Sequence, residues 1–282
     1  MPLRGYAVTI VGLGLMGGSL ALALRGKCAQ LVGVAHRPEL AELAVRKDVV
    51  DACLALPEAV READIVVLAT PVRRIVSDIP ELAAYTRPGA LLIDLGSTKV
   101  QVVQAMNDLP EGLLAVGGHP MCGREVGGLE SADPLLFIDS TFVLTPTARS
   151  THDAITLAVD MVHAVGARPL VLDAAQHDQA VAVISHLPYL LASTLMHTEA
   201  QASAELPVVH DLASSGFRDT TRLAASQLEM MLDILLTNGA AIESALDRFE
   251  QTLAEARGLL RDPALLQCWM AEAQSRRREM FT

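Results

Sequence analysis

Three glycines near the start of the chain are spaced in a way that suits phosphate binding. Gly12, Gly14 and Gly17 form a Gly-x-Gly-x-x-Gly pattern after the apolar run 7–12 and before a stretch rich in leucine and alanine. Between a strand and a helix, this spacing lets the backbone approach a pyrophosphate, and the helix N-terminus offers free N–H groups. The residues that we expect to contact a dinucleotide are Gly12, Leu13, Gly14, Leu15, Met16 and Gly17, with Thr70 and Pro71 from a later turn.

The type of dinucleotide depends on the end of the next apolar run, residues 31–35. An acidic side chain at this place usually accepts hydrogen bonds from the adenosine ribose of NAD. His36 and Arg37 stand there instead, and a guanidinium suits a 2′-phosphate through charge-assisted hydrogen bonds. The sequence predicts NADP as cofactor, with NAD bound without an acidic clamp as the alternative.

Two polar residues follow later apolar runs. Ser97 comes after the run 90–96, and His119 comes after the run 113–118. The carboxyl ends of parallel strands meet at one sheet edge, where substrate and cofactor bind. A histidine there can take the proton of a substrate hydroxyl while a hydride leaves the same carbon. We predict His119 to be catalytic, although a lone histidine is often structural.

Further polar residues gather in the second part of the chain. His177 and Asp178 precede Ser185 and His186, and the spacing of residues 177, 181 and 184–185 places them on one helix face. Two arginines flank Asp219 in the segment 214–222, which we expect to be a loop. Arg218 and Arg222 suit either a surface ion-pair cluster or a carboxylate clamp, and both interpretations stay open.

The elements that must position these residues follow from the hydrophobic pattern. Short runs rich in β-branched residues alternate with helical patterns, which is typical of a parallel, doubly wound sheet of the Rossmann type. After about residue 173 the pattern is helical. We expect a dinucleotide-binding domain over residues 1–173 and a helical substrate and dimerisation domain over 174–282. The predicted strands cover residues 7–12, 31–35, 64–70, 90–96, 113–118, 141–147 and 168–173.

One long helical pattern carries an apolar seam. Its members recur at steps of three and four: Ile242, Leu246, Phe249, Leu253, Ala256 and Leu260. Such a seam needs a partner helix, either within the chain or in a second copy. Both interpretations stay open, and we expect a homodimer.

Composition excludes several classes of protein. The 282 residues are 51% hydrophobic and carry a net charge of −11, so a nucleic acid partner is not expected. The uncharged segment 7–24 superficially resembles a signal peptide or a membrane span, but its glycines fit the strand, turn and helix better. The four cysteines form no Cys-x-x-Cys pair, so we expect no disulfide, no metal site and a reducing cytoplasm.

Taken together, these motifs resemble the prephenate/arogenate dehydrogenase family of tyrosine biosynthesis. The resemblance covers nearly the whole chain. The matching segments are GLGLMGGSL (12–20), ATPV (69–72), DLGSTK (94–99), GGHPMCGRE (117–125), HDQAVAVISHLP (177–188) and SSGFRDTTR (214–222).

The resemblance implies a reaction and roles for single residues. The family performs the oxidative decarboxylation of a cyclohexadienol as an interlocked homodimer. His119 would take the proton of the ring hydroxyl, Ser97 would share that hydroxyl and help to seat the nicotinamide, and Arg222 would bind the ring carboxylate. The remaining substrate contacts that it implies are Arg218, Glu125, His177, Asp178, Ser185, His186 and Tyr189.

One departure bears on the substrate. Prephenate-preferring relatives often read SHLPH, whereas this chain reads SHLPY with Tyr189. Together with the missing acidic clamp, this favours arogenate and NADP over prephenate and NAD. The chain ends in a helical pattern at 263–281, so we expect no trailing tyrosine-binding module.

Two other functions stay open at this point. A β-hydroxyacid or imine-type dehydrogenase would share the architecture, but such enzymes usually rely on a lysine in the helical part, and none follows Lys99. A non-catalytic NADP-sensing protein would keep the fold without the reaction. The joint presence of Ser97, His119 and Arg222 argues against a sensor.

Overall fold

Eight strands form one sheet in this computed structural model, which describes residues 3–124 and 126–281. Their order is β3-β2-β1-β4-β5-β6-β7-β8. The order reverses between β1 and β4, where open α/β sheets bind ligands. The strands are β1 (Ala7–Val11), β2 (Gln30–Val34), β3 (Ala52–Cys53), β4 (Ile65–Leu68), β5 (Leu91–Asp94), β6 (Leu114–Pro120), β7 (Thr141–Pro146) and β8 (Arg168–Val171).

The Rossmann-type fold is confirmed, but the last two strands differ from the predicted parallel sheet. Strands β1 to β6 are parallel, whereas β7 pairs antiparallel with β6, and β8 is parallel to β7. Among its described residues, the connection from β6 to β7 contains only the short helix η1 (Leu129–Ser131). A parallel return needs a longer crossover, usually through an α-helix. The two-residue strand β3 was too short to predict.

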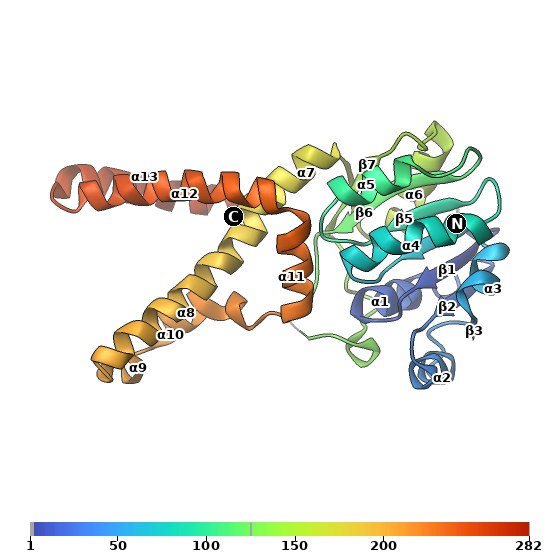
Figure 1. Cartoon of the computed structure of the whole chain (residues 1–282), viewed down its shortest axis with the longest axis horizontal. Helices are drawn as coiled ribbons and strands as arrows, with labels where there is room; N and C mark the ends of the chain where they lie inside the picture. Colours follow the sequence, from blue (N-terminus) through green and yellow to red (C-terminus); the bar gives the residue numbers. More distant parts are fainter. Residues whose placement is uncertain (1–2, 125, 282) are drawn as a thin grey trace.

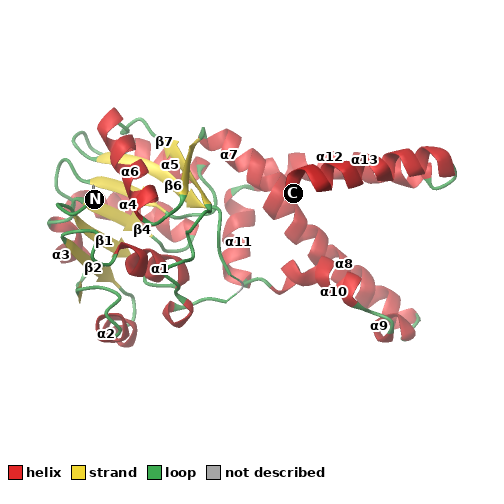
Figure 2. Cartoon of the chain, turned by 180° about the vertical axis from the view of Figure 1, so that it is seen from behind, coloured by secondary structure: helices red, strands yellow, loops and turns green. Residues whose placement is uncertain are grey.

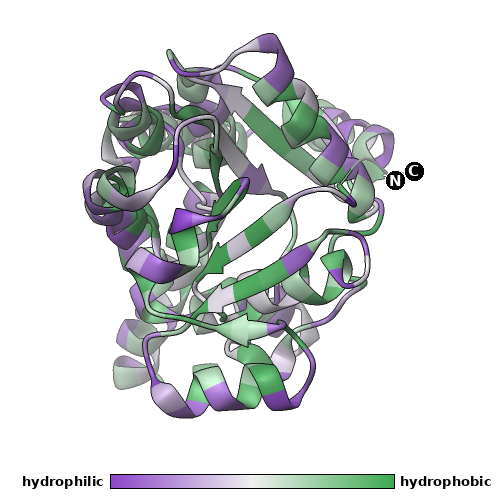
Figure 3. Ribbon diagram, turned by 90° about the vertical axis from the view of Figure 1, so that its right-hand side faces the viewer, coloured by the Kyte–Doolittle hydropathy of each residue, from purple (hydrophilic) through white to green (hydrophobic). Residues whose placement is uncertain are grey.

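Both faces of the sheet are covered by helices. Alternate strand residues point to opposite faces, so Ile65 and Val67 join one apolar cluster and Val66 and Leu68 join another. The strands are mostly apolar in Figure 3, while the helices show a polar outer side. One face carries α1 (Leu15–Leu24), α2 (Pro38–Arg46) and α6 (His152–Ala164), and the other carries α3 (Leu56–Arg61), α4 (Val72–Tyr85) and α5 (Val100–Asn107).

In the described part of the chain, the regular elements after β8 are helices, and they form a separate part of the molecule (Figures 1 and 2). We call this part the helical half and the preceding part the sheet half. Two arms diverge in Figure 1, one made of α8 with α9 and α10, the other of α12 with α13. The helices are α7 (Ala174–Val181), the π-helical turn η2 (Ala182–His186), α8 (Leu187–Glu205), α9 (Val208–Asp211), α10 (Ser215–Thr221), η3 (Arg222–Ala225), α11 (Leu228–Thr237), α12 (Gly239–Leu259) and α13 (Pro263–Phe281).

The segment 214–222 is helical, so the prediction of a loop was wrong. It forms α10 and the start of η3, and both pack against α8. Thr221 is buried, and its hydroxyl donates to the Phe217 carbonyl at 2.7 Å within the same helix. Packing against α8 therefore stabilises a helix that the local residue types did not suggest.

A second correction concerns the helix face predicted for residues 177 to 185. His177 and Val181 are buried, but Ile184 and Ser185 are exposed. The π-helical turn η2 inserts one extra residue per turn, so the buried face continues through Ala182 and His186.

The continuous helix 174–205 is also long and apolar enough, by length and composition, to cross a membrane.

The apolar seam on α12 divides into two parts. Ile242 is 5% exposed, and Leu246 and Phe249 pack in the same small cluster with residues of α8. Further along the helix, Leu253 is 56% exposed and Leu260, just beyond its end, is 70% exposed. The inner part of the seam therefore has a partner within the chain, and the outer part faces solvent.

Candidate active site

The glycine turn joins β1 to α1 at the β1–β4 crevice. Gly12 has a φ of +100°, and a Cβ there would lie 2.9 Å from the Ala69 carbonyl oxygen. A Cβ on Gly17 would lie 1.9 Å from the Gly12 oxygen, so strand and helix approach closely. By contrast, a Cβ on Gly14 would meet no atom within 4 Å.

This turn fits a pyrophosphate. The open space at Gly14 adjoins the N-terminus of α1, where no side chain caps the free N–H groups. Leu15 and Met16 begin the helix and are partly exposed, whereas the Leu13 side chain is buried in the core. Only the backbone of Leu13 is therefore available to a ligand.

The adenosine end of the predicted site lies after β2. His36 and Arg37 are both exposed there, and Arg37 occupies the N-cap position of α2. Thr70 and Pro71 follow β4, and the Thr70 methyl group lies beside Gly12. The predicted cofactor residues thus line the carboxyl ends of β1, β2 and β4.

His119 lies within β6 and not after it, because the strand extends to Pro120 through its pairing with β7. The side chain is partly exposed at the same sheet edge as the glycine turn. Its Nδ1 lies 2.8 Å from Nε2 of His177, which comes from α7 in the helical half. Ser97, after β5, is partly exposed on the neighbouring loop.

His177 and Asp178 are 1% and 2% exposed. Nδ1 of His177 lies 2.7 Å from Oδ1 of Asp178. The two carboxylate oxygens of Asp178 also accept the backbone N–H groups of Lys99 at 2.7 Å and Val100 at 2.9 Å. Asp178 therefore caps the N-terminus of α5, a helix of the sheet half that has no side-chain cap of its own.

A buried ion pair lies behind His119 and was missing from the predicted site. The Lys99 ammonium contacts the Asp94 carboxylate and donates to the Gly118 carbonyl oxygen at 2.7 Å. Asp94 in turn accepts the Gly118 N–H at 2.9 Å. The pair thus fixes the backbone next to His119. The sequence carried a signal for it, because these are the only charged residues in the segment 90–103.

The surroundings keep His119 neutral. Desolvation lowers the pKa of His119 well below its usual value, and His177, Lys99 and His186 lower it further. A neutral imidazole is the form that can accept a proton. Burial also lowers the pKa of His186 to about 4.

The junction of the two halves includes Asn238, which was also missing from the prediction. It lies between α11 and α12, where its Nδ2 donates to the Asp178 carbonyl oxygen at 2.8 Å and lies 3.2 Å from Nδ1 of His186. The hydroxyl groups of Thr98 and Thr237 meet nearby at 2.8 Å. The asparagine-glycine pair at 238–239 is an ordinary turn signal, which gave no hint of this role.

The other predicted substrate residues lie further along the helical half. Tyr189 is partly exposed on α8, and Ser185 is exposed on η2. Arg218 is exposed on α10, where it pairs with Asp219 at 3.2 Å, and Arg222 is exposed at the start of η3. Glu125 lies outside the described residues.

Comparisons with known proteins match both halves of the chain. Residues 20–171 match the family model "Prephenate dehydrogenase, nucleotide-binding domain", and residues 173–271 match "Prephenate dehydrogenase, dimerization domain". The cyclohexadienyl dehydrogenase of Zymomonas mobilis is 33% identical over 258 residues, which cover 89% of this chain and 87% of that protein.

Two solved structures have nearly the same extent and fold. The arogenate dehydrogenase of Synechocystis is 30% identical with a TM-score of 0.87, covering 97% of this chain and 99% of that one. The prephenate dehydrogenase of Aquifex aeolicus, solved in complex with hydroxyphenyl propionate and NAD+, is 30% identical with a TM-score of 0.91. That match covers 99% of this chain and 100% of the other.

Proposed function

The chain belongs to the prephenate dehydrogenase family of oxidoreductases, and from this premise we propose that it catalyses the oxidative decarboxylation of a cyclohexadienol. In this reaction a hydride leaves the ring carbon that bears the hydroxyl group. The ring carboxylate leaves as carbon dioxide, and the electron pair of the broken bond makes the ring aromatic. The observation that carries the proposal is the partly exposed His119, which contacts His177 and lies at the same sheet edge as the glycine turn.

The cofactor supplies the hydride acceptor, a nicotinamide. In our proposal, the backbone of the glycine turn binds its pyrophosphate, and Thr70 and Pro71 lie along it. Arg37 binds a 2′-phosphate, so we propose NADP as the preferred cofactor. NAD is the competing choice, since the Aquifex relative was solved with NAD+.

His119 acts as the base in this proposal. It takes the proton of the ring hydroxyl as the hydride leaves, and returns it to the oxygen of the phenol product. Ser97 hydrogen-bonds the same hydroxyl and helps to seat the nicotinamide. The low pKa of His119 supports this role, because the side chain stays unprotonated at neutral pH.

The helical half orients the substrate in this proposal. Arg222 binds the ring carboxylate, since a guanidinium forms two parallel hydrogen bonds with it. Tyr189 lies near the substrate side chain and favours arogenate over prephenate. The other proposed contacts are Arg218 near the side chain, Glu125 as a gate, and Ser185 and His186 in the pocket wall.

We further propose a homodimer, with the domain boundary at residues 173/174. The exposed outer part of the α12 seam and the apolar helix 174–205 support it, because a second copy would cover both. The four cysteines are free thiols, which suits our placement of the enzyme in the reducing cytoplasm.

One assay tests the proposed function. Purified protein is mixed with each pair of prephenate or arogenate and NAD or NADP, and reduced nicotinamide is followed by its absorbance. We expect the highest kcat/KM with arogenate and NADP. Turnover of a β-hydroxyacid alone would favour the other dehydrogenase class, and cofactor binding without turnover of any substrate would favour a sensor.

A further inference from the structure

The side chain of His119 is the end of a buried chain of hydrogen bonds. Its Nδ1 meets Nε2 of His177 at 2.8 Å, and Nδ1 of His177 meets Oδ1 of Asp178 at 2.7 Å. Each link uses a different ring nitrogen, so the protons along the chain cannot be placed independently. The two inner residues are almost fully buried, so water does not replace these partners.

The donor-to-acceptor direction of these hydrogen bonds follows from Asp178. Its carboxylate oxygens accept the N–H groups of Lys99 and Val100, which provide no acceptor in return. Nδ1 of His177 therefore donates to Asp178, and Nε2 of a neutral His177 must be an acceptor. It follows that Nδ1 of His119 carries the proton and donates. Nε2 of His119 is left with a free electron pair.

The opposite direction is disfavoured by charge. It requires a proton on both ring nitrogens of His177, hence a buried imidazolium. The ammonium of Lys99 disfavours a positive charge on His119, which is the hydrogen-bond partner of His177. The assigned direction adds no charge to this space.

We infer that His177 and Asp178 are positioning residues that hold His119 in the Nδ1–H tautomer, which leaves Nε2 as the proton acceptor. The inference rests on the proposed function only for the identity of the proton that Nε2 takes. Once His119 is protonated, His177 and Asp178 stabilise the imidazolium through the same two hydrogen bonds. Because Asp178 also caps α5, the junction of the two halves sets the tautomer of the base.

The test begins with the tautomer itself. Side-chain ¹⁵N NMR of the substrate-free protein at neutral pH separates protonated from bare ring nitrogens, and the His119→Ala spectrum identifies the His119 signals. We expect Nδ1–H and bare Nε2 in the wild type. A wild-type His119 protonated on Nε2 overturns the inference whatever the substrate is, so this outcome is distinct from a failure of the proposed function.

Two variants of His177 separate positioning from packing. His177→Phe keeps a ring of similar size but removes the acceptor, whereas His177→Gln keeps an acceptor for His119 and a donor for Asp178. We expect His177→Phe to lose the Nδ1–H preference of His119 and to lower kcat by roughly 10²-fold or more, with little change in the cofactor KM. His177→Gln should retain the Nδ1–H tautomer of His119, and its kcat should be at least tenfold higher than that of His177→Phe. Equal kcat values for the two variants, with both tautomers unchanged, would contradict the assignment.

Discussion

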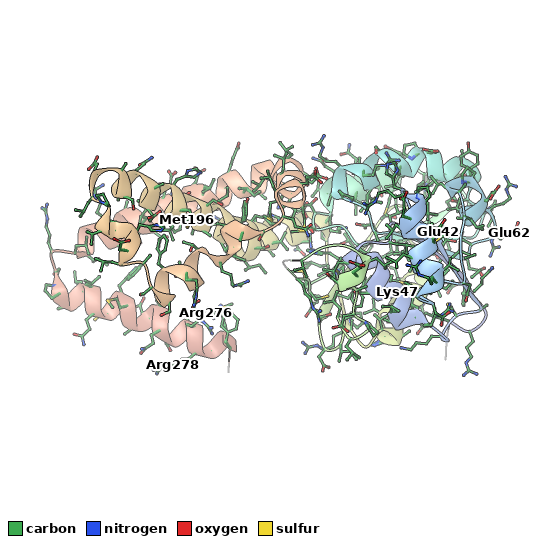
Figure 4. All side chains as sticks on the ribbon, turned by 90° about the horizontal axis from the view of Figure 1, so that it is seen from below. Glu42, Lys47, Glu62, Met196, Arg276 and Arg278 are labelled. Atoms are coloured by element: carbon green, nitrogen blue, oxygen red, sulfur yellow. The ribbon has the colours of Figure 1, made fainter. Side chains whose placement is uncertain are left out.

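The two halves of the molecule bury their apolar side chains to very different extents. The sheet half holds two large buried clusters, one on each face of the sheet. Among the described residues, the buried cluster of the helical half is small and consists of Ala182, Leu187, Ile242 and Ala245. No described residue of α13 is buried, although the helix runs from Pro263 to Phe281. Figure 4 shows Met196 of α8 and Arg276 and Arg278 of α13 in this open half, away from the sheet.

This difference indicates where each half obtains its stability. A doubly wound sheet covers both its faces with helices from the same chain, so its core is complete in one copy. The helices of the other half leave large apolar side chains exposed, among them Leu206, Leu212 and Met270. A monomer rarely exposes such surfaces without a partner. We expect the helical half to depend on a second copy and the sheet half to be independent of it.

The largest expected effect comes from charge on the outer part of the α12 seam. Leu253→Glu with Leu260→Glu should dissociate the dimer. A dimer contains four of these leucines, and the burial of each contributes about 1.5 kcal/mol to the free energy of association. Losing all four contributions raises the dimer dissociation constant Kd by roughly 10⁴-fold. Analytical ultracentrifugation measures this change.

A matched pair in the sheet half provides the control. Val45 and Leu54 are 43% and 41% exposed, so replacing both with glutamate adds the same charge to comparable apolar positions. We expect this control to remain a dimer. Dissociation of both variants, or of neither, would remove the contrast between the halves.

The next largest effect concerns His119. His119→Ala should lower kcat by about 10²- to 10⁴-fold while cofactor affinity and the dimer stay unchanged. In the wild type, kcat/KM should fall with decreasing pH only below 6.5, because protonation of His119 removes the base and its pKa is lowered. A variant that keeps more than about a tenth of the wild-type kcat would exclude His119 as the base.

The effect of Arg222 should be smaller and lie mainly in binding. Arg222→Ala leaves the ring carboxylate without a cation, so KM for the substrate should rise roughly 30-fold, corresponding to about 2 kcal/mol. Arg222→Lys should recover little, since an ammonium lacks the two-pronged geometry. Steady-state kinetics with saturating cofactor measures both variants. An unchanged KM in Arg222→Ala would mean that the ring carboxylate of the substrate does not bind Arg222.

The smallest effect is expected for the exposed Arg37. Arg37→Ala should raise KM for NADP about tenfold and leave KM for NAD nearly unchanged, because only NADP carries the 2′-phosphate. Arg46→Ala removes an exposed arginine from the other end of α2 and is the matched control. Equal changes in KM for NADP and NAD would mean that Arg37 does not bind the 2′-phosphate.

Local patterns predicted the sheet half well because its signals are local. The run 64–70 predicts a strand, and the glycine pattern predicts a strand-to-helix turn, each from only a few residues. The direction of β7 was not predictable in this way, since it depends on the connection 121–140, which looks irregular in sequence. The helicity of 214–222 depends on packing against α8, a contact that the residue types within the segment do not reveal.

The candidate site divides in the same manner. The placement of His119 and the glycine turn at one sheet edge could be predicted from the sequence, because both lie at the ends of apolar runs. The links from His119 to His177, and from Asp178 to α5, join residues 58 and 78 or more positions apart. Spacing on a helix predicted which residues share a face, and the π-helical turn η2 broke that rule.

That turn has a geometric consequence for the helix from α7 to α8. Each residue of an α-helix advances the side chains by about 100° around the axis, so one inserted residue rotates everything beyond it by that angle. Before η2, His177 of α7 contacts His119, whereas beyond η2 the first leucines of α8, Leu187, Leu190 and Leu191, pack against α12. Deleting one residue between Ala182 and His186 would restore a single azimuth. The helix would then lose either the contact of α7 with His119 or the packing of α8 against α12.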